Sequence, residues 1–398
     1  MEINNTKQLI KVGITTFINS LGAMIFAYAL SLYLLKKTGS AFSYGTSLFA
    51  GPIIGLLMSP IIGKVIDNNS HKHVAIISEV GLIITIIVFL IVFNLTNKQY
   101  VYIISVIFIV LSEIFARFFT LTYLSSTPEM VEENYHQRLN SIQSVSNSVS
   151  SIIAAPIAGV LIAKINFNYI ISLEIITEII TLLMIIITKF NNLPQKKEKN
   201  NIKKINFLKD YRTIFIFSIF AVISNFMNTL MQIGVPYIIV NKLNESTEVS
   251  GNLQGLLSWG VFLGGILVTL IAFKNELKAL KHIYFINFVV LALLGISVEW
   301  LPINIIIIFA IFEFVLGLIN GIADPPFFTY IQSVVPRESL GQVNTYLYTI
   351  VQLLTPFGIV IYSILIESVE FQLLFLLNGF IALIIALVLL KVLKIVKE

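Results

Sequence analysis

The sequence predicts an all-α membrane protein with twelve transmembrane helices in two pseudo-symmetric six-helix bundles. The mean hydropathy is +0.91 and only 12% of the residues are charged, compared with about 25% in a typical soluble domain. The apolar residues form blocks separated by short polar segments, and roughly 20 apolar residues suffice for one helix to cross a bilayer. With twelve such blocks, the 398 residues leave about 33 for each span and its loop.

The predicted spans cover residues 10–35, 44–66, 73–94, 99–125, 138–163, 167–190, 210–240, 249–273, 281–300, 303–330, 338–366 and 370–396. Residues 191–209 are rich in Lys and Asn and lack apolar periodicity, which is typical of a solvated linker. This segment is predicted to be a cytoplasmic linker between an N-terminal bundle, residues 1–190, and a C-terminal bundle, residues 210–398.

The basic residues predict the orientation of the chain. Most of the 26 Lys and Arg lie in the tails, or in the loops that share a side with the N-terminus. The exceptions are one arginine within a span and five lysines: Arg117, Lys36, Lys37, Lys98, Lys164 and Lys242. Because cytoplasmic loops carry an excess of Lys and Arg, both termini are predicted to be cytoplasmic. The net charge of +5 therefore indicates topology, and no nucleic-acid partner is expected.

The two halves also resemble each other weakly. Thr122-Tyr123 and Thr329-Tyr330 each end the fourth span of their half, and an acidic loop follows. Repeats of this kind place a substrate site near the membrane midplane, where the halves meet. Chance similarity between apolar helices is the alternative.

Two long segments resemble the macrolide-efflux-like drug exporters of the major facilitator superfamily. Residues 20–41, SLGAMIFAYALSLYLLKKTGSA, resemble the first helix of that branch. Residues 317–346, GLINGIADPPFFTYIQSVVPRESLGQVNTY, resemble its second-half signature. The resemblance implies a major-facilitator-like fold and the export of drugs by alternating access.

Two shorter motifs carry residue roles that the resemblance implies. The loop that contains Gly63 and Asp67 is similar to the superfamily's G-x-x-x-D-R motif, with Asn68 at the arginine position. The resemblance implies that Asp67 and Gly63 form a latch that holds the cytoplasmic side shut, and an ordinary turn aspartate is the alternative. Pro156 and Gly159 resemble a reduced form of the exporter motif in the fifth span.

Acidic residues within spans are costly and usually functional. Glu313, Gly317, Asn320 and Asp324 follow one another at helical spacing and form a polar stripe along one helix face. Burial disfavours the charged form of a carboxyl group, so Glu313 and Asp324 are predicted to load and release protons, with sodium as an alternative ion. A structural acid that hydrogen-bonds to a neighbouring helix remains the other interpretation, above all for Asp324.

Two further pairs of charged or acidic residues lie at i, i+4 spacing. Glu113 and Arg117 can pair on one face of the fourth span, as a structural pair or as part of the coupling site. Glu174 and Glu178 form a similar pair in the sixth span. That span usually lies on the outer side of this fold, so we expect a role in helix packing or in an external gate.

Uncharged polar residues predict an amphipathic pocket. Asn225, Asn228 and Gln232 share one face of the seventh span. The other candidate cavity residues are Asn19, Asn320, Tyr348 and Gln352. Scattered amides among aromatic side chains suit bulky lipophilic molecules better than sugars.

The sequence therefore predicts a secondary transporter of the bacterial inner membrane that exports amphipathic drugs such as macrolide-like antibiotics, driven by protons. No cofactor, metal, nucleotide motif or enzymatic activity is expected, and the protein is predicted to be a monomer. A lipid-precursor flippase, a metabolite porter, a non-transport immunity or sensor protein and a membrane enzyme remain alternatives.

Overall fold

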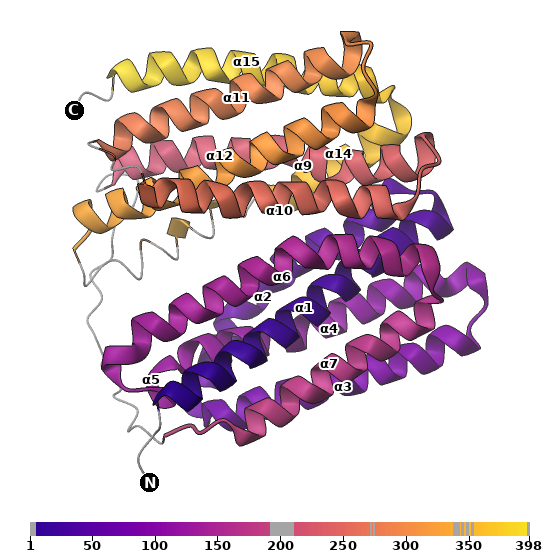
Figure 1. Ribbon diagram of the computed structural model, residues 1–398, viewed down its shortest axis with the longest axis vertical. Coiled ribbons are helices and arrows are strands. Elements are labelled where there is room, and N and C mark those ends of the chain that lie inside the picture. The colour runs from indigo at the N-terminus through magenta and orange to yellow at the C-terminus, as the bar shows by residue number, and fades with distance from the viewer. Residues whose placement is uncertain are drawn as a thin grey trace. The chain divides into compact units, whose positions relative to one another are not determined.

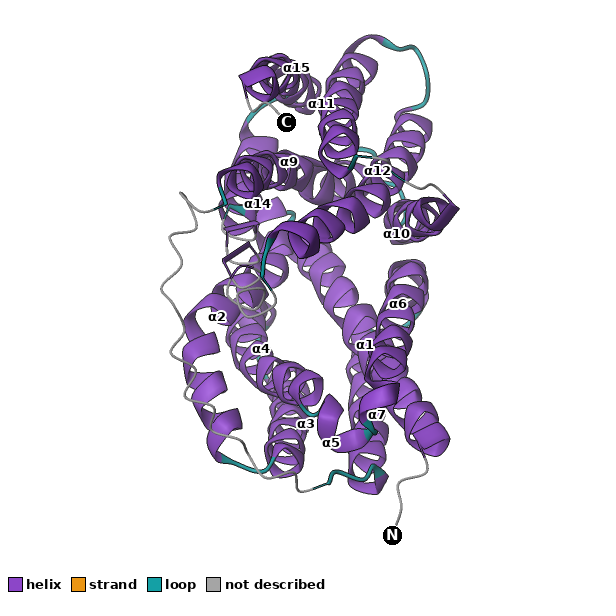
Figure 2. Ribbon diagram, turned by 90° about the vertical axis from the view of Figure 1, so that its left-hand side faces the viewer, coloured by secondary structure: helices purple, strands orange, loops and turns teal. Residues whose placement is uncertain are grey.

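The computed structural model describes residues 5–191, 211–336 and 354–395, apart from 271, 272 and 274. Between 337 and 353 it describes only residues 343, 346, 347, 350 and 351. Within these ranges the chain forms helices and loops and no strand (Figure 2). The all-α prediction is confirmed.

Twelve helices of the described residues follow the order of the twelve predicted spans (Figure 1). Their bounds are α1 Asn5–Thr38, α2 Ala41–Asn68, α3 His71–Leu95, α4 Val101–Ser125, α6 His136–Lys164, α7 Phe167–Ile187, α9 Arg212–Tyr237, α10 Thr247–Leu270, α11 Glu276–Trp300, α12 Ile305–Val334, α14 Thr355–Ser368 and α15 Phe371–Ile395. Short helical turns join some of them, namely η1 Lys98–Tyr100, α5 Thr127–Met130, η2 Glu133–Tyr135 and η3 Ile238–Lys242. Ten of the helices in the described ranges are long and apolar enough to cross a membrane.

Asparagine side chains start three of these helices. Asn166 accepts from the backbone N–H of Asn168 at 3.0 Å, and Asn275 accepts from the N–H of Lys278 at 2.8 Å. Asn304 accepts from the N–H of Ile306 at 2.9 Å. The first backbone N–H groups of a helix have no partner within the helix, and a side-chain oxygen supplies one. The local sequence thus fixes the starts of α7, α11 and α12.

The chain divides into two compact units, residues 1–38 with 46–198 and residues 39–45 with 199–398. In the first unit α1 packs on α6 and α7, and α3 packs on α4 and α7. In the second unit α9 packs on α14, while α11 packs on α12 and α15. The pairs α1–α6, α3–α4 and α3–α7 therefore have counterparts in α9–α14, α11–α12 and α11–α15. The predicted linker falls almost wholly outside the described residues, so the predicted domain limits stay a prediction.

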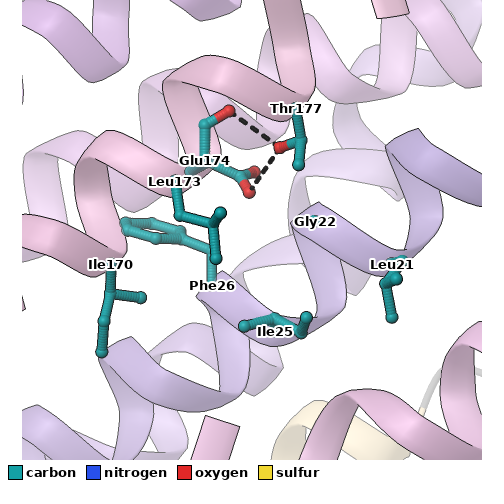
Figure 3. Close-up of a pocket in the computed structure, with 8 residues that line it drawn as sticks. All are labelled: Leu21, Gly22, Ile25, Phe26, Ile170, Leu173, Glu174 and Thr177. Atoms are coloured by element: carbon teal, nitrogen blue, oxygen red, sulfur yellow. Dashed lines mark hydrogen bonds between the residues drawn. The ribbon is translucent and has the colours of Figure 1, made fainter. Parts of the chain in front are cut away.

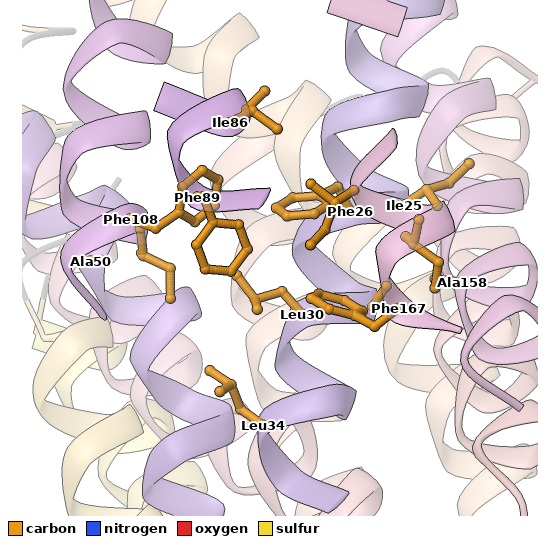
Figure 4. Packing of buried hydrophobic residues seen from close by; sticks show 14 of the residues in the cluster. Ile25, Phe26, Leu30, Leu34, Ala50, Ile86, Phe89, Phe108, Ala158 and Phe167 are labelled. Atoms are coloured by element: carbon orange, nitrogen blue, oxygen red, sulfur yellow. The ribbon is translucent and has the colours of Figure 1, made fainter. Parts of the chain in front are cut away.

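An aromatic cluster forms the core of the first unit (Figure 4). Phe89 stacks on Phe108 at 4.2 Å between ring centroids, and Phe26 meets the edge of Phe108 at 5.6 Å. Tyr33 stacks on Phe167 at 4.3 Å. These rings come from α1, α3, α4 and α7, so aromatic packing ties four helices of this unit together.

In the second unit, α10 and α12 cross with their backbones in close approach. A Cβ atom at Gly260 would lie 2.3 Å from the carbonyl oxygen of Phe314, and one at Gly321 would lie 2.1 Å from that of Val261. Gly264 and Gly317 are equally confined by the opposite backbone. Both helices thus present glycines four residues apart, a pattern that lets membrane helices pack closely. This crossing fixes the position of α12.

Gly39 makes the turn between α1 and α2. Its φ is +68°, a conformation that glycine adopts at helix ends because it has no Cβ. The short segment 39–45 that follows belongs to the second unit. There Ser40 donates to Glu367 at 2.8 Å, and Asn241 donates to the carbonyl oxygen of Gly39 at 2.8 Å.

Candidate functional site

The second unit contains a pocket of about 290 Å³ lined by polar side chains of several helices. Its lining residues are Asn225, Asn228, Thr229, Met231, Gln232, Gln254, Leu257, Glu313, Leu316, Asn320 and Thr355. The structure thus brings together four of the predicted cavity residues and one of the predicted coupling acids. Gln254 of α10 and Thr229 of α9 also line this pocket and were not among the predicted residues.

Helical spacing explains why these residues meet. Asn225, Asn228 and Gln232 are three and seven residues apart, so they lie on one face of α9. Glu313 and Asn320 are seven residues apart on α12 and likewise share a face. The close crossing of α10 and α12 brings Leu257 of α10 against the same segment of α12. The pocket therefore follows from two polar stripes and one glycine-mediated crossing.

Glu313 is the acidic residue of this pocket, and its side chain is only 3% exposed. The ion pairs found in the described residues are His71–Glu129 and Arg117–Glu113, so Glu313 has no basic partner there. The amide oxygen of Asn228 is also buried and makes no hydrogen bond within the described ranges. An uncompensated carboxylate at this depth is costly. A charged Glu313 therefore needs donors from water, a ligand or the nearby amides.

Asp324 lies in a different environment, although it shares the polar stripe of α12. Asp324 is exposed and does not line the pocket. The sequence analysis predicts the same proton-coupling role for Glu313 and Asp324. In the structure, Glu313 is buried at the pocket, whereas Asp324 is exposed and lies nearer the C-terminal end of α12.

Glu113 and Arg117 of α4 form the predicted i, i+4 pair, with Oε2 and Nε 3.8 Å apart and both side chains about 30% exposed. Two glycines of α2 make room for them. A Cβ at Gly51 would lie 3.0 Å from Glu113, and one at Gly55 would lie 3.5 Å from Arg117. The separation of 3.8 Å is near the limit for an ion pair, and Nε of Arg117 is buried without a hydrogen bond among the described residues, so we expect a weak interaction.

Asn19 does not belong to the amide pocket. Its Nδ2 donates to Oε2 of Glu178 at 3.1 Å, within the first unit. Glu178, Glu174 and Glu79 are all buried there, with exposed fractions of 0%, 5% and 0%. Sequence reasoning missed Glu79 of α3, the one acid in an otherwise apolar span.

The remaining predicted site residues lie at helix ends or within helices. Asp67 is exposed in the last turn of α2, and a Cβ at Gly63 would meet nothing within 4 Å. Pro156 lies inside α6, and Gly159 is buried in the same helix. Tyr348 and Gln352 lie outside the described residues.

His71 lies close to a carboxyl group of α5. Its Nδ1 lies 2.7 Å from Oε1 of Glu129 in α5. Burial raises the pKa of the Glu129 carboxyl, and the neighbouring His71 opposes that shift. The residues described by the structure contain no group of three His, Cys, Asp or Glu side chains that could hold a metal ion.

Solved structures share the fold of the whole chain. The nucleoside transporter NupG matches with a TM-score of 0.72 at 13% identity, covering 96% of this chain and 99% of that one. A D-xylose-proton symporter matches with a TM-score of 0.69 at 12% identity, covering 96% of each chain. A bacterial homologue of the iron transporter ferroportin, in an inward-facing state, gives 0.72 at 13% identity, with 96% and 98% covered. The twelve-helix, two-bundle prediction is confirmed.

Sequence comparison agrees with the fold. Macrolide efflux protein A of Streptococcus pyogenes is 22% identical over 382 residues, covering 92% of this chain and 90% of that protein. The family model of the Major Facilitator Superfamily matches residues 12–359. This match spans most of the chain and includes both units, so the predicted resemblance is confirmed. The chain is a multi-pass membrane protein and belongs to the Major Facilitator Superfamily.

Proposed function

We propose that the protein exports amphipathic, macrolide-like molecules in exchange for protons. The family gives the general activity, transport of a small molecule across a membrane. The name of the relative macrolide efflux protein A supports the substrate class. The observation that carries the proposal is the buried carboxyl of Glu313 at the wall of an amide-lined pocket.

The pocket suits part of an amphipathic substrate. Its volume of about 290 Å³ lies at the lower end of the range of roughly 300–1,000 Å³ for ligand sites. Leu257, Leu316 and Met231 supply apolar wall, while the amides supply a few orienting groups. A large macrolide would place one polar edge here.

Glu313 links this pocket to the proton gradient. The acid is neutral while the pocket is closed to water, because burial disfavours its charge. Access to water on the low-proton side lets the carboxyl ionise, and the ionised group then needs the donors of the amides or of a bound substrate. Proton release and substrate binding thereby alternate at one place.

Proteoliposomes test this proposal directly. Purified protein is reconstituted, a pH difference is imposed, and accumulation of radiolabelled erythromycin is measured. Glu313→Gln should abolish the response to the pH difference but keep exchange of labelled for unlabelled drug, because the glutamine preserves shape and removes only the titration. Glu299→Gln, at an exposed acid of α11, is the matched control.

The outcomes separate the possible assignments. Wild-type coupling in Glu313→Gln would exclude Glu313 as the proton carrier, and loss of coupling in Asp324→Asn instead would move the role to the exposed acid. Accumulation driven by a sodium gradient and not by pH would identify sodium as the ion. No gradient-driven movement of the drug would refute the export proposal.

We further propose that the protein is a monomer in the bacterial plasma membrane with both termini cytoplasmic. The chain contains no cysteine, so a single introduced cysteine reports its side. A membrane-impermeant maleimide should label Asn97→Cys, before α4, in intact cells and Ser70→Cys, before α3, only after the membrane is opened. The reverse pattern would invert the orientation.

The proposed latch at Asp67 has its own test. Asp67→Ala should slow drug transport while leaving the amount of protein in the membrane unchanged. Asn68→Ala is the matched control, because among the described residues its side chain donates to the carbonyl oxygen of Lys64 in its own helix. Equal transport by both variants would reduce Asp67 to a turn residue.

A further inference from the structure

The first unit contains a buried carboxyl cluster that the proposed coupling at Glu313 does not use. The cluster consists of Glu79 of α3 with Glu174 and Glu178 of α7, and Asn19 of α1 adjoins it. The exposed fractions of the three acids are 0%, 5% and 0%. Three helices therefore turn acidic or amide side chains toward one another inside an apolar bundle.

Basic residues do not neutralise this cluster. The ion pairs in the described part of the chain involve Glu113 and Glu129, and none involves the three acids. Lys11 of α1 and Lys72 of α3 bond to backbone carbonyl oxygens. Lys72 donates to the carbonyl oxygens of Ile186 and Thr188, and Lys11 donates to that of Ile187. These carbonyls lie at the end of α7, about two turns beyond Glu178.

The hydrogen bonds of the cluster are incomplete without added protons. Glu178 accepts from Asn19, and Glu174 accepts from Thr177 at 3.3 Å. Both oxygens of Glu79 and Oε1 of Glu178 are buried without a partner among the described residues. An ionised carboxyl group is an acceptor only, whereas a protonated one is also a donor. Since Glu178 lies beside both Glu79 and Glu174, protons on these two acids would give Glu178 two more donors.

A tyrosine next to the acids is a second, independent group whose hydrogen bonding is incomplete. Tyr123 of α4 is 5% exposed. Its hydroxyl is buried and makes no hydrogen bond within the described ranges. Thr15 and Glu79 both lie near it. Among the titratable groups of the surrounding helices α1, α3, α4 and α7, the interacting set is Glu79, Glu174, Glu178 and Tyr123. A phenol hydroxyl beside carboxyl groups can both donate and accept a hydrogen bond.

Glu174 also borders a small cavity between α1 and α7 (Figure 3). Its volume is about 140 Å³, and Glu174 and Thr177 are the polar residues of an otherwise apolar lining. Figure 3 shows the Glu174 carboxyl and Thr177 hydroxyl together at this cavity, with Gly22 of α1 opposite. A Cβ at Gly22 would lie 2.3 Å from the Thr177 hydroxyl, so the glycine lets α1 approach α7 closely beside Glu174.

We propose that Glu79, Glu174 and Glu178 form a proton-binding site of the first unit that loads and releases protons during transport. This inference rests on the proposed function and extends it, because Glu313 would then be one of two proton sites. Glu178 is the central acceptor, and Glu79 and Glu174 carry the exchanging protons. Exchange of more than one proton per drug molecule follows.

Infrared difference spectroscopy tests the cluster without any drug. Purified protein in lipid nanodiscs is shifted from about pH 5 to about pH 9, a range in which buried glutamates titrate. The carbonyl band of protonated carboxyl groups should decrease in the wild type. Glu79→Gln and Glu174→Gln should each remove part of that change, and Glu299→Gln should remove none. Glu313→Gln should leave the cluster's part in place.

Three results would overturn the proposal. The first is a band in the wild type that stays constant over the whole pH range, because the cluster would then be permanently protonated. The second is a loss of the band on adding sodium at constant pH, which would make it a cation site. The third is a set of folded Glu→Gln variants with the full wild-type change. The first two results are read in the wild type and in Glu313→Gln, which removes the contribution of Glu313. Neither result depends on the cluster variants or on macrolide transport.

A second measurement connects the cluster to transport. In proteoliposomes, protons taken up per erythromycin molecule exported should fall in Glu79→Gln, while erythromycin binding stays at the wild-type level because the amide pocket belongs to the second unit. An unchanged proton-to-drug ratio would show that the cluster titrates outside the transport cycle and would overturn its role in coupling.

Discussion

The crossing of α10 and α12 can be tested with two neighbouring glycines. A Cβ at Gly264 would lie 2.4 Å from the carbonyl oxygen of Leu318, whereas ordinary contact begins at 3.4 Å. At Gly265 a Cβ would meet nothing within 4 Å. Gly264→Ala must therefore separate two backbones by about 1 Å, and Gly265→Ala disturbs no neighbour. The two variants therefore differ in the contact between α10 and α12, whereas the change in helix propensity is the same in both.

The magnitude follows from the overlap. Overpacking of a dense interior costs about 1–3 kcal/mol, and a rigid backbone oxygen places Gly264→Ala toward the upper end. Replacing glycine by alanine in a helix contributes about 1 kcal/mol in the opposite direction at both positions. For a unit of this size each kcal/mol corresponds to about 2–4 °C in Tm. Gly264→Ala should therefore melt roughly 2–12 °C below Gly265→Ala.

The assay heats detergent-solubilised protein and measures the remaining monodisperse fraction by size-exclusion chromatography. Erythromycin binding at low temperature provides a second readout, because α12 carries Glu313 and Asn320 into the pocket. Gly264→Ala should bind more weakly than Gly265→Ala. Equal melting temperatures for the two variants would refute the close crossing and with it the account of how α12 is positioned.

Three further changes probe the packing of each unit. Tyr362→Phe removes the O–H that donates to Asn378 at 2.6 Å and should cost about 1 kcal/mol or more in thermal unfolding, since it leaves a buried acceptor without its donor; an unchanged Tm would contradict this bond. A double-mutant cycle of Glu113→Gln and Arg117→Gln should give a coupling energy below about 1 kcal/mol, and a larger value would reveal a desolvated pair. Phe108→Ala should cost about 3–5 kcal/mol, measured as a fall in Tm, because it removes the ring on which Phe89 stacks; a loss below 1 kcal/mol would show that the cluster collapses around the gap.

The sequence predicted the parts of this protein that depend on local patterns. Hydropathy located all twelve helices, because each bilayer crossing needs its own apolar block. The amide stripe of α9 and the position of Glu313 followed from helical spacing, and the structure brings them to one pocket. The glycines of the α10–α12 crossing also lie at four-residue spacing in the sequence. Of these glycines, the sequence analysis used Gly317, as part of the polar stripe.

The side chains that meet across helices were harder to predict. The sequence did not predict that Asn19 bonds to Glu178 of another helix. The role of Glu79 was not predictable from local spacing, because its partners are about 95 and 99 residues away on another helix. One sequence signal was available, since Glu79, Glu174 and Glu178 are acids within apolar spans and none has a basic residue at i±3 or i±4. Acids without local partners must find partners, or protons, elsewhere.

The two units also show that the fold itself does not require the carboxyl cluster. Glu79 belongs to the third helix of the first unit, and the corresponding third helix of the second unit, α11, carries a buried Asn287. Asn287 donates to Ser224 of α9 at 2.7 Å, a bond between neutral groups. A neutral amide and hydroxyl can therefore join the third helix to its neighbours in this architecture. Carboxyl groups in the equivalent layer add a cost of burial without a gain in packing, and that cost is understandable if the groups exchange protons.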